Sequence, residues 1–337
     1  LPFDFFWRPL IESEMAPSKV FFRSFSAATK TQRNRGSIRL KWLKNIAEYL
    51  QQFVEFPPIN LPDFNMPSNP NVINNHQIEN LARDVRRFWG LGDGVISNVV
   101  RLLEKNGVII ARDYIGADSI DAFSEWEEGQ RPYIILSSDK CSSARSRFDV
   151  AHELAHLILH RNVDKKILNK ASEFKLMEDQ ANYFAAAFLL PEETFAKDCY
   201  FVTLDVLRTL KAKWVLSIGM MLQRSKQIGL CSEEQLQQLW RLYSRRGWKK
   251  REPLDDELPI EEPHLLRLSF ELIISRNIQT RNDVLHNLPY TAADIEELAG
   301  LSPGYLSDAQ LEIRLSSNII SRNKVVNFPP DKNKRLK

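Results

Sequence analysis

The sequence has few cysteines and no long apolar runs. Its 337 residues include only Cys141, Cys199 and Cys231, with no Cys-x-x-Cys pair. A disulfide framework is therefore excluded as the basis of the fold, and a reducing, cytoplasmic location is expected. No apolar run approaches the roughly 20 residues that a membrane span needs. The first residues also lack the basic region and cleavage site of a secretory signal, so we expect no membrane partner.

The chain has no strong excess of charge of either sign. The formal net charge is +3, which is too small to indicate a class of partner. Basic residues nevertheless cluster, with eight Lys or Arg and no acid between Lys19 and Lys44, and six with no acid between Gln238 and Arg251. Aromatic residues interleave both clusters, which suits binding to a nucleic-acid backbone. An ordinary solvated helix face has the same pattern and is the more common case.

The most informative segment is His-Glu-Leu-Ala-His at residues 152–156. On a helix, His152 and His156 stand one turn apart on one face, where two neutral imidazoles can bind one Zn²⁺ at about 2.0–2.1 Å. Glu153 lies beside the metal as a candidate general base. The flanking residues are strongly apolar, and a metal would satisfy polar groups that are costly to bury alone. The pattern therefore predicts one zinc ion per chain and hydrolytic chemistry, rather than a core helix with incidental histidines.

A catalytic zinc needs a third protein ligand and a free fourth position. His160 follows the motif by four residues without a glycine turn, and one helix does not readily place three successive histidines on a tetrahedral ion. Glu178 is the better candidate, because it shares a helical stripe with small alanines that allow close helix approach. Asp179 and Glu173 remain alternatives. A carboxylate near a helix start is also favoured by the helix dipole alone, without any ligand role.

Two segments together resemble the ImmA/IrrE family of zinc metallopeptidases. They read RFDVAHELAHLILH at residues 147–160 and EDQANYFAAAFLLP at residues 178–191. The resemblance covers at least residues 80–200. It implies an α+β fold with a zincin-like peptidase core, in which the HExxH helix packs on a small sheet and the N- and C-terminal regions are mostly helical.

The resemblance also implies roles for individual residues. In the family, two His and the Glu at the head of the ExxANxFA helix bind zinc, which corresponds to His152, His156 and Glu178. The Glu of HExxH acts as the base, which corresponds to Glu153. The chain departs from the family at Gln180, where a second acidic residue is frequent. Gln180 is not expected to touch the metal, so the ligand set stays intact.

The function implied is a zinc-dependent endopeptidase with a narrow target. The family resemblance implies that the protein substrate is a helix-turn-helix repressor, cleaved to derepress a mobile-element, defence or stress operon. The alternative is a DNA-binding transcriptional regulator whose peptidase-like domain senses a signal without cleavage. The cellular metal is left open between zinc and manganese, because affinity order and availability decide it.

The length of the chain suggests two or three domains. We predict an N-terminal connector and helix at 1–70, a metallopeptidase domain at 71–200, a helical C-terminal domain at 201–330 and a basic tail at 331–337. The start LPFDFFWRP lacks a Met and resembles the tail of the XRE-type helix-turn-helix domain that often precedes such peptidases. We therefore expect the DNA-reading helices to be missing here. DNA would be a partner through that missing domain and the basic segments.

Periodicity places the secondary structure around these motifs. Apolar residues spaced three and four apart predict helices at 27–56, 76–90, 97–106, 204–214, 217–228 and 232–243, and further helices within 263–330. Short apolar runs predict strands at 108–114, 122–126 and 132–137, with a hairpin turn at Gly129 and Gln130. Caps are expected at Asp93 or Ser97 and at Ser217 and Ser232. An edge strand of this sheet could pair with an extended substrate.

One loop leads into the predicted metal-binding helix. Cys141 lies in it, and a thiolate there could fill the open zinc position and silence the enzyme. A small loop residue without such a role is the more common case. Arg145 and Arg147 could orient substrate carbonyls or anchor the loop, and we favour the anchoring role.

Overall fold

The structure is a computed structural model that describes residues 20–22, 29–114, 116, 121–127, 129–138, 142–164, 167 and 170–307. The predicted helix-turn-helix tail, Cys141 and the basic tail lie outside the described residues.

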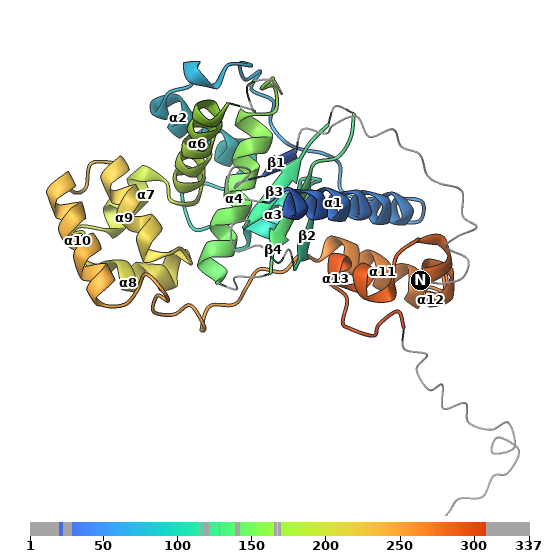
Figure 1. The fold of residues 1–337 in the computed structure, drawn as a ribbon. Helices are drawn as coiled ribbons and strands as arrows, with labels where there is room; N and C mark the ends of the chain where they lie inside the picture. The colour runs from blue at the N-terminus through green and yellow to red at the C-terminus, as the bar shows by residue number, and fades with distance from the viewer. Residues whose placement is uncertain are drawn as a thin grey trace, which may run out of the picture.

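The centre of the fold is a four-stranded sheet (Figure 1). Its order is β1-β3-β4-β2, formed by β1 (Val20–Phe22), β3 (Ala122–Glu125), β4 (Tyr133–Ser137) and β2 (Ile109–Asp113). β1 pairs with β3 and β3 with β4 in antiparallel orientation, whereas β2 and β4 are parallel. The three strands expected from the sequence are confirmed within two residues, and β1 is an additional edge strand.

Both faces of this sheet are covered by helices. Successive side chains of a strand point to opposite faces, and the strands divide accordingly: Ile110, Ile134 and Leu136 join one core, while Ile109 and Ile135 join another. Because both faces are covered, β4 and the start of β2 are continuous apolar runs rather than an alternation of apolar and polar residues. The predicted α+β class is thereby confirmed.

The first face carries the helices that build the candidate site. α4 (Ser143–Leu159) lies against β3 and β4, and α6 (Ala171–Leu189) packs along α4. α2 (Asn75–Phe88) covers α6, and α3 (Val99–Lys105) packs against α4. The 3₁₀ turn η2 (Pro70–Val72) also contacts α6.

The second face is covered by helices from the two ends of the described chain. α1 (Lys30–Gln51) begins at a capping box on Thr29. The helices α11 (Leu265–Ser275), α12 (Arg281–Asn287) and α13 (Ala292–Ala299) come from the far end. Their apolar side chains form one core with α1 and the sheet. Figure 1 shows α1 and α11–α13 on the side of the sheet opposite to α4 and α6.

The remaining helices extend the first core into a lobe. This lobe consists of α7 (Glu192–Asp198), α8 (Leu204–Trp214), α9 (Ile218–Gln227) and α10 (Glu233–Arg245). Ser217 and Ser232 cap α9 and α10 as predicted, and each accepts a hydrogen bond from a backbone N–H of the first turn. The cap expected at Asp93 or Ser97 is wrong, because Asn98 caps α3 and accepts from the Arg101 N–H at 2.7 Å. Residues 201–307 thus divide between the two cores, with α8–α10 in the first and α11–α13 in the second.

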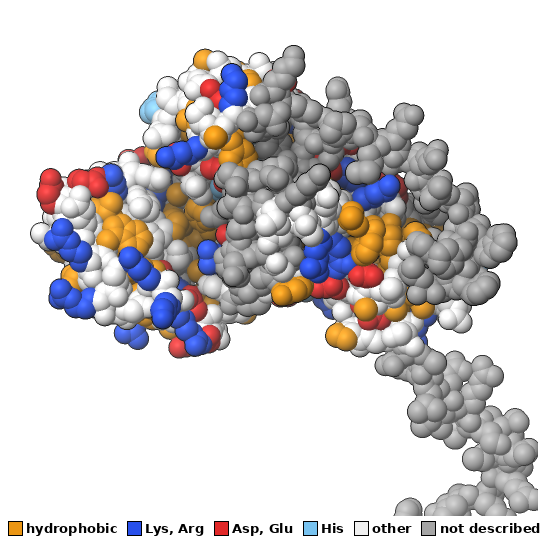
Figure 2. Space-filling model, in the orientation of Figure 1, with side chains coloured by type: hydrophobic (Ala, Val, Ile, Leu, Met, Phe, Trp, Pro, Cys, Tyr) orange, Lys and Arg blue, Asp and Glu red, His pale blue; other side chains and the backbone are white. Residues whose placement is uncertain are grey.

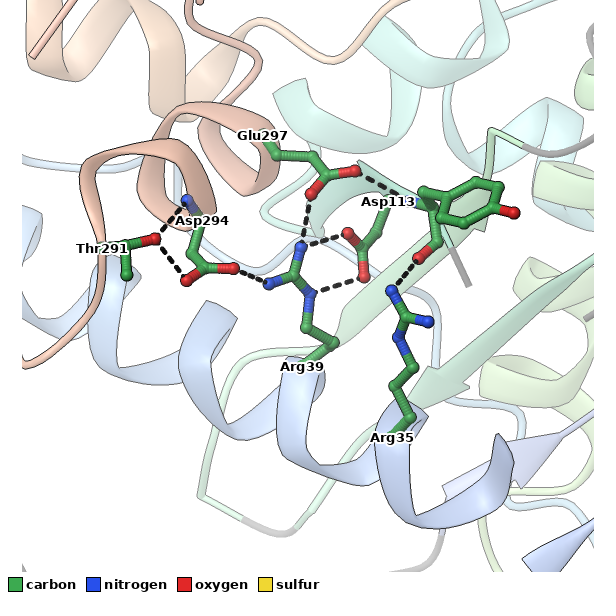
Figure 3. A network of polar contacts seen from close by, with 7 residues as sticks. Arg35, Arg39, Asp113, Thr291, Asp294 and Glu297 are labelled. Carbon is green, nitrogen blue, oxygen red and sulfur yellow. Dashed lines mark hydrogen bonds and ion pairs between the residues drawn. The ribbon is translucent and has the colours of Figure 1, made fainter. Parts of the chain in front are cut away.

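A buried ion network joins α1, β2 and α13 (Figure 3). Arg39 donates through Nε to Asp113 at 2.7 Å, and its Nη atoms reach Asp294 at 2.6 Å and Glu297 at 2.7 Å. Desolvation alone would lower the pKa of Arg39, but the surrounding carboxylates outweigh it and raise the pKa. One guanidinium therefore connects three elements that are far apart in the sequence.

Among the helices described here, none is long and apolar enough to cross a membrane.

Candidate metal centre

The two histidines and the glutamate of the HExxH motif lie on the buried helix α4. His152, Glu153 and His156 are at most 1 % exposed. The helix is enclosed because apolar residues, including Val150, Leu154 and Leu157, occupy the rest of its circumference and are buried. The polar groups of the motif are consequently held in a low-dielectric setting, where an unsatisfied imidazole or carboxylate would be costly.

Glu178 of α6 completes the group. The His152 and His156 Nε2 atoms are 3.1 Å apart. The Glu178 carboxylate lies 3.4 Å from the first and 3.2 Å from the second. Two ligand atoms bound to one tetrahedral zinc at about 2.0–2.1 Å would lie about 3.3 Å from each other. All three separations fit one such ion, so these residues suit a divalent cation. Within the described part of the chain, no second group of three such donors converges in this way.

Hydrogen bonding on the far side of His152 leaves its Nε2 available. The His152 Nδ1 faces the Asn182 Oδ1 at 3.0 Å, so Nδ1 carries the proton and donates. Asn182 belongs to α6 and follows Glu178 by one helical turn. The same helix therefore supplies a ligand and orients a second one, as the partners of metal-bound histidines commonly do.

A longer chain of hydrogen bonds sets the orientation of His156. The Gln180 amide nitrogen donates to the carbonyls of Pro70 and Ile73, at 2.8 and 3.0 Å. Its Oε1 therefore faces the His160 Nε2 at 3.1 Å and accepts from it. Because a neutral imidazole carries one proton, the His160 Nδ1 accepts from the His156 Nδ1 at 2.9 Å. The His156 Nε2 is then left with a lone pair pointing to Glu178 and His152. We call this chain the Gln180–His160 relay.

The charges of these groups agree with a cation site. Burial, with a smaller contribution from His156, lowers the pKa of His160 to about 3, so its ring is neutral near pH 7. Burial alone would raise the pKa of Glu178, but its contacts with the His152 and His156 rings lower it to about 2. The candidate ligands are thus two imidazoles and one ionised carboxylate, a donor set that zinc enzymes use.

The other sequence candidates lie elsewhere. Glu173 accepts a hydrogen bond from the Asn71 amide at 2.6 Å, and Asp179 is exposed. Arg147 is buried, pairs with Glu261 and donates to the Ile96 carbonyl at 2.6 Å, which is the anchoring role expected for it. Arg145 is exposed and lies 3.6 Å from Asp121.

Sequence reasoning did not find the residues that orient the ligands. Gln180 was notable only as a departure from the family pattern, and His160 only as a poor third ligand. Their helical spacing could have indicated them, because His160 follows His156 by one turn at the end of α4 and Asn182 follows Glu178 by one turn on α6.

A large groove adjoins this centre. Its volume is about 1330 Å³, and it lies between α4 and α6 on one side and α9, α10 and residues 248–256 on the other. We call it the α6–α9 groove. Phe148 and Asn182, which both contact His152, line it.

Comparison with known families agrees with this geometry. No curated protein matches the chain. Residues 103–226 match the family described as Peptidase_M78, IrrE N-terminal-like domain. The matched segment runs from the end of α3 to the end of α9. It includes α4 and α6, which form one side of the groove. Residues 103–226 are therefore similar to the IrrE N-terminal-like family, a metallopeptidase family, in agreement with the resemblance carried by the two sequence motifs.

Proposed function

We propose that the protein is a zinc-dependent endopeptidase of the HExxH type. The observation that carries the proposal is the convergence of two imidazole nitrogens and one carboxylate at separations that fit a single tetrahedral ion. His152, His156 and Glu178 would hold the ion. When bound, Zn²⁺ supplies Lewis-acid activation of water and of a substrate carbonyl.

Glu153 serves as the general base in this proposal. Its carboxylate is fully buried on α4, directly after the first ligand. It accepts the proton of the attacking water and passes it to the amine that leaves, which restores the carboxylate for the next turnover. His160 and Gln180 are buried and do not touch substrate; together with Asn182 they hold the ligand rings in place.

The proposed substrate is a helix-turn-helix repressor protein, and the proposed role is to relieve repression of a mobile-element, defence or stress operon. The family resemblance supports this assignment. The alternative, a DNA-binding regulator that senses a signal without cleaving, needs no general base beside its metal, and the presence of Glu153 therefore favours the peptidase.

The test compares the wild type and two variants for cleavage of a candidate helix-turn-helix repressor. The wild type should cleave it, and a chelator should abolish cleavage. Glu153→Gln should retain zinc by elemental analysis and lose at least about 100-fold in turnover, because general-base catalysis typically contributes 10²–10⁴-fold. His156→Ala should lose the metal itself. Undiminished cleavage by Glu153→Gln would remove Glu153 as base, and full zinc occupancy in His156→Ala would refute the ligand set.

A further inference from the structure

One end of the α6–α9 groove is lined by residues that contact or neighbour the candidate ligands. Asn182 both lines the groove and hydrogen-bonds His152, and Phe148 lines it with its ring 6.4 Å from the His152 ring. Asp179, the neighbour of Glu178, also lines it. A molecule that lies in the groove therefore has one end beside the proposed zinc ligands. The volume of the groove, about 1330 Å³, exceeds the 300–1,000 Å³ of ordinary small-molecule sites, which favours a polymer as the occupant.

The length of the groove along α6 corresponds to a few residues of extended peptide. Asp179 and Ala186 line its near wall and are seven residues apart on the helix. At 1.5 Å per helical residue they are about 10 Å apart along the axis. An extended peptide rises about 3.3 Å per residue. A strand that runs along this wall from Asp179 to Ala186 thus spans about three residues.

The far wall presents aromatic rings. Trp240, Tyr243 and Trp248 line the groove and meet edge to face, with ring centroids 5.0 and 6.0 Å apart. Trp240 packs directly over Gly219, where an added Cβ would lie 3.2 Å from the Trp240 ring. Trp240 and Trp248 are only half-buried. Such partly open aromatic walls suit an aromatic or large apolar side chain.

The rim next to these rings is positively charged. Lys249 and Lys250 are exposed, and neither makes an ion pair with any residue that the structure describes. Their neighbour Arg251, in contrast, pairs with Asp256. On the face drawn in Figure 2, Lys and Arg side chains surround a hydrophobic patch on the lobe of α8–α10. An acidic residue of the occupant would be attracted to this end of the groove.

The charge of the rest of the groove argues against a nucleic acid. Asp149 and Asp179 line the near wall, and the basic residues of the lining are interrupted by Asp255 and Asp256, which pair with Lys211 and Arg251. The groove is therefore not the continuous basic track that a phosphate backbone favours, and acidic side chains would repel it near the metal centre. A polypeptide with one acidic end and a neutral stretch near the metal meets no such repulsion.

We propose that the α6–α9 groove binds the substrate polypeptide on one side of the scissile bond. It selects an aromatic or large apolar side chain about three residues from that bond, followed by an acidic residue. Trp240 and Trp248 contact the apolar side chain, and Lys249 and Lys250 the acidic one. This selectivity rests on the proposed peptidase function and extends it to a class of sequence.

The experiment profiles cleavage of a proteome-derived peptide library by mass spectrometry. The wild type should show enrichment of aromatic or large apolar residues three positions from the cleaved bond on one side, with Asp or Glu next. The double variant Lys249→Glu/Lys250→Glu should lose about tenfold in its preference for the acid, since two exposed ion pairs contribute about 0.2–1 kcal/mol each. Trp248→Ala should weaken the apolar preference.

The matched control is Arg241→Glu/Arg245→Glu. These arginines are exposed on α10 in the same basic cluster but do not line the groove. The control should keep the wild-type profile, and Glu153→Gln should cleave nothing. Cleavage by the wild type with the same profile in every groove variant would overturn the groove assignment and leave the peptidase intact.

A binding measurement keeps the two proposals separable if the wild type cleaves no peptide. The probe is a fluorescent decapeptide containing Trp followed by two Glu, titrated with the Glu153→Gln protein and followed by anisotropy. Binding that weakens about tenfold in Lys249→Glu/Lys250→Glu would support the groove assignment even without catalysis. Absence of binding, or displacement of the peptide by a single-stranded oligonucleotide, would overturn it.

Discussion

At the scale of single residues, the Gln180–His160 relay decides where the His156 lone pair points. His160 donates to Gln180 and accepts from His156, and Gln180 is itself fixed by the carbonyls of Pro70 and Ile73. Removal of either relay residue would free the His156 ring to rotate or to change tautomer. The affinity for metal should then fall although all three candidate ligands remain.

We predict that His160→Leu and Gln180→Leu each weaken zinc binding by about 10–100-fold, the usual effect of losing a partner of a metal-bound histidine. Competition with a chromogenic chelator measures the affinity. His286→Leu is the matched control, because that histidine is exposed on α12 and should leave the affinity unchanged. Wild-type affinity in both relay variants would show that packing alone orients His156.

The ligands could be predicted from the sequence, but the relay that orients them could not. The ligand candidates follow from a one-turn spacing within α4 and from a stripe on α6, which are local patterns. The relay depends on a contact between Gln180 and the backbone of η2, which is about 110 residues away in the chain. No local spacing encodes such a contact, so Gln180 could be read only as a departure from the family.

At the scale of elements, Arg39 joins α1 to β2 and α13 (Figure 3). Its partner Asp113 is only 1 % exposed, so loss of the guanidinium would leave a buried carboxylate without its cation. Breaking a buried ion pair in this way typically costs about 3–5 kcal/mol.

We predict that Arg39→Met lowers the free energy of unfolding by about 3 kcal/mol in urea titrations. Arg35→Met is the matched control, one turn earlier on α1, because Arg35 is exposed and, among the described residues, donates to the Tyr114 carbonyl alone, at 3.0 Å. Its effect should stay below about 1 kcal/mol. Equal effects of the two substitutions would mean that the network contributes no more than a surface contact.

A second prediction at this scale concerns pH. The buried Glu104 accepts hydrogen bonds from the first backbone N–H groups of α11, at 2.8 Å from Leu265 and 2.9 Å from His264. Burial raises its pKa from 4.5 to about 6 despite these bonds. The folded state therefore binds the proton more tightly than the unfolded state does, and stability falls as the pH rises from about 4.5 to 6.

The stability difference between wild type and Glu104→Gln isolates this group, because glutamine does not titrate. Between pH 4 and pH 7 we expect the wild type to lose about 2 kcal/mol of unfolding free energy relative to Glu104→Gln. Urea unfolding at several pH values measures this difference. Glu257→Gln, at an exposed position, should give a difference that is flat by comparison. A flat difference for Glu104→Gln as well would mean that Glu104 has an ordinary pKa.

These helix ends explain which element boundaries the sequence could predict. Ser217 and Ser232 cap their own helices, and both were found from local sequence. The first turns of α3 and α11, however, are also capped by carboxylates from distant parts of the chain. Glu261 accepts from the Val99 N–H of α3 at 2.7 Å, and Glu104 accepts from the Leu265 N–H of α11 at 2.8 Å. A carboxylate more than 150 residues away satisfies these N–H groups, so no local signal marks it. β1 was missed for a similar reason, since three residues paired to β3 are too short to show a period.

At the scale of the whole molecule, the sheet needs helices from both ends of the described chain. Ile109, Phe123 and Ile135 are fully buried beneath α1 and α11–α13. Burial of each such side chain contributes about 1.5–3 kcal/mol, so these three alone account for about 5–9 kcal/mol. That is comparable to the entire stability of a typical domain, about 5–15 kcal/mol.

We therefore predict that a fragment of residues 71–200, the range delimited as a peptidase domain from sequence, does not fold cooperatively by itself. It lacks α1 and α11–α13 on one face and α8 and α9 beside α6 on the other, so both cores are open. Urea unfolding followed by circular dichroism should show no sharp transition, and the fragment should bind a hydrophobic dye. A fragment of residues 20–307, which retains both cores, is the control and should unfold in a sharp transition. A sharp transition of the short fragment at the same urea concentration would show that the sheet and the metal-binding helices are stable without their outer cover.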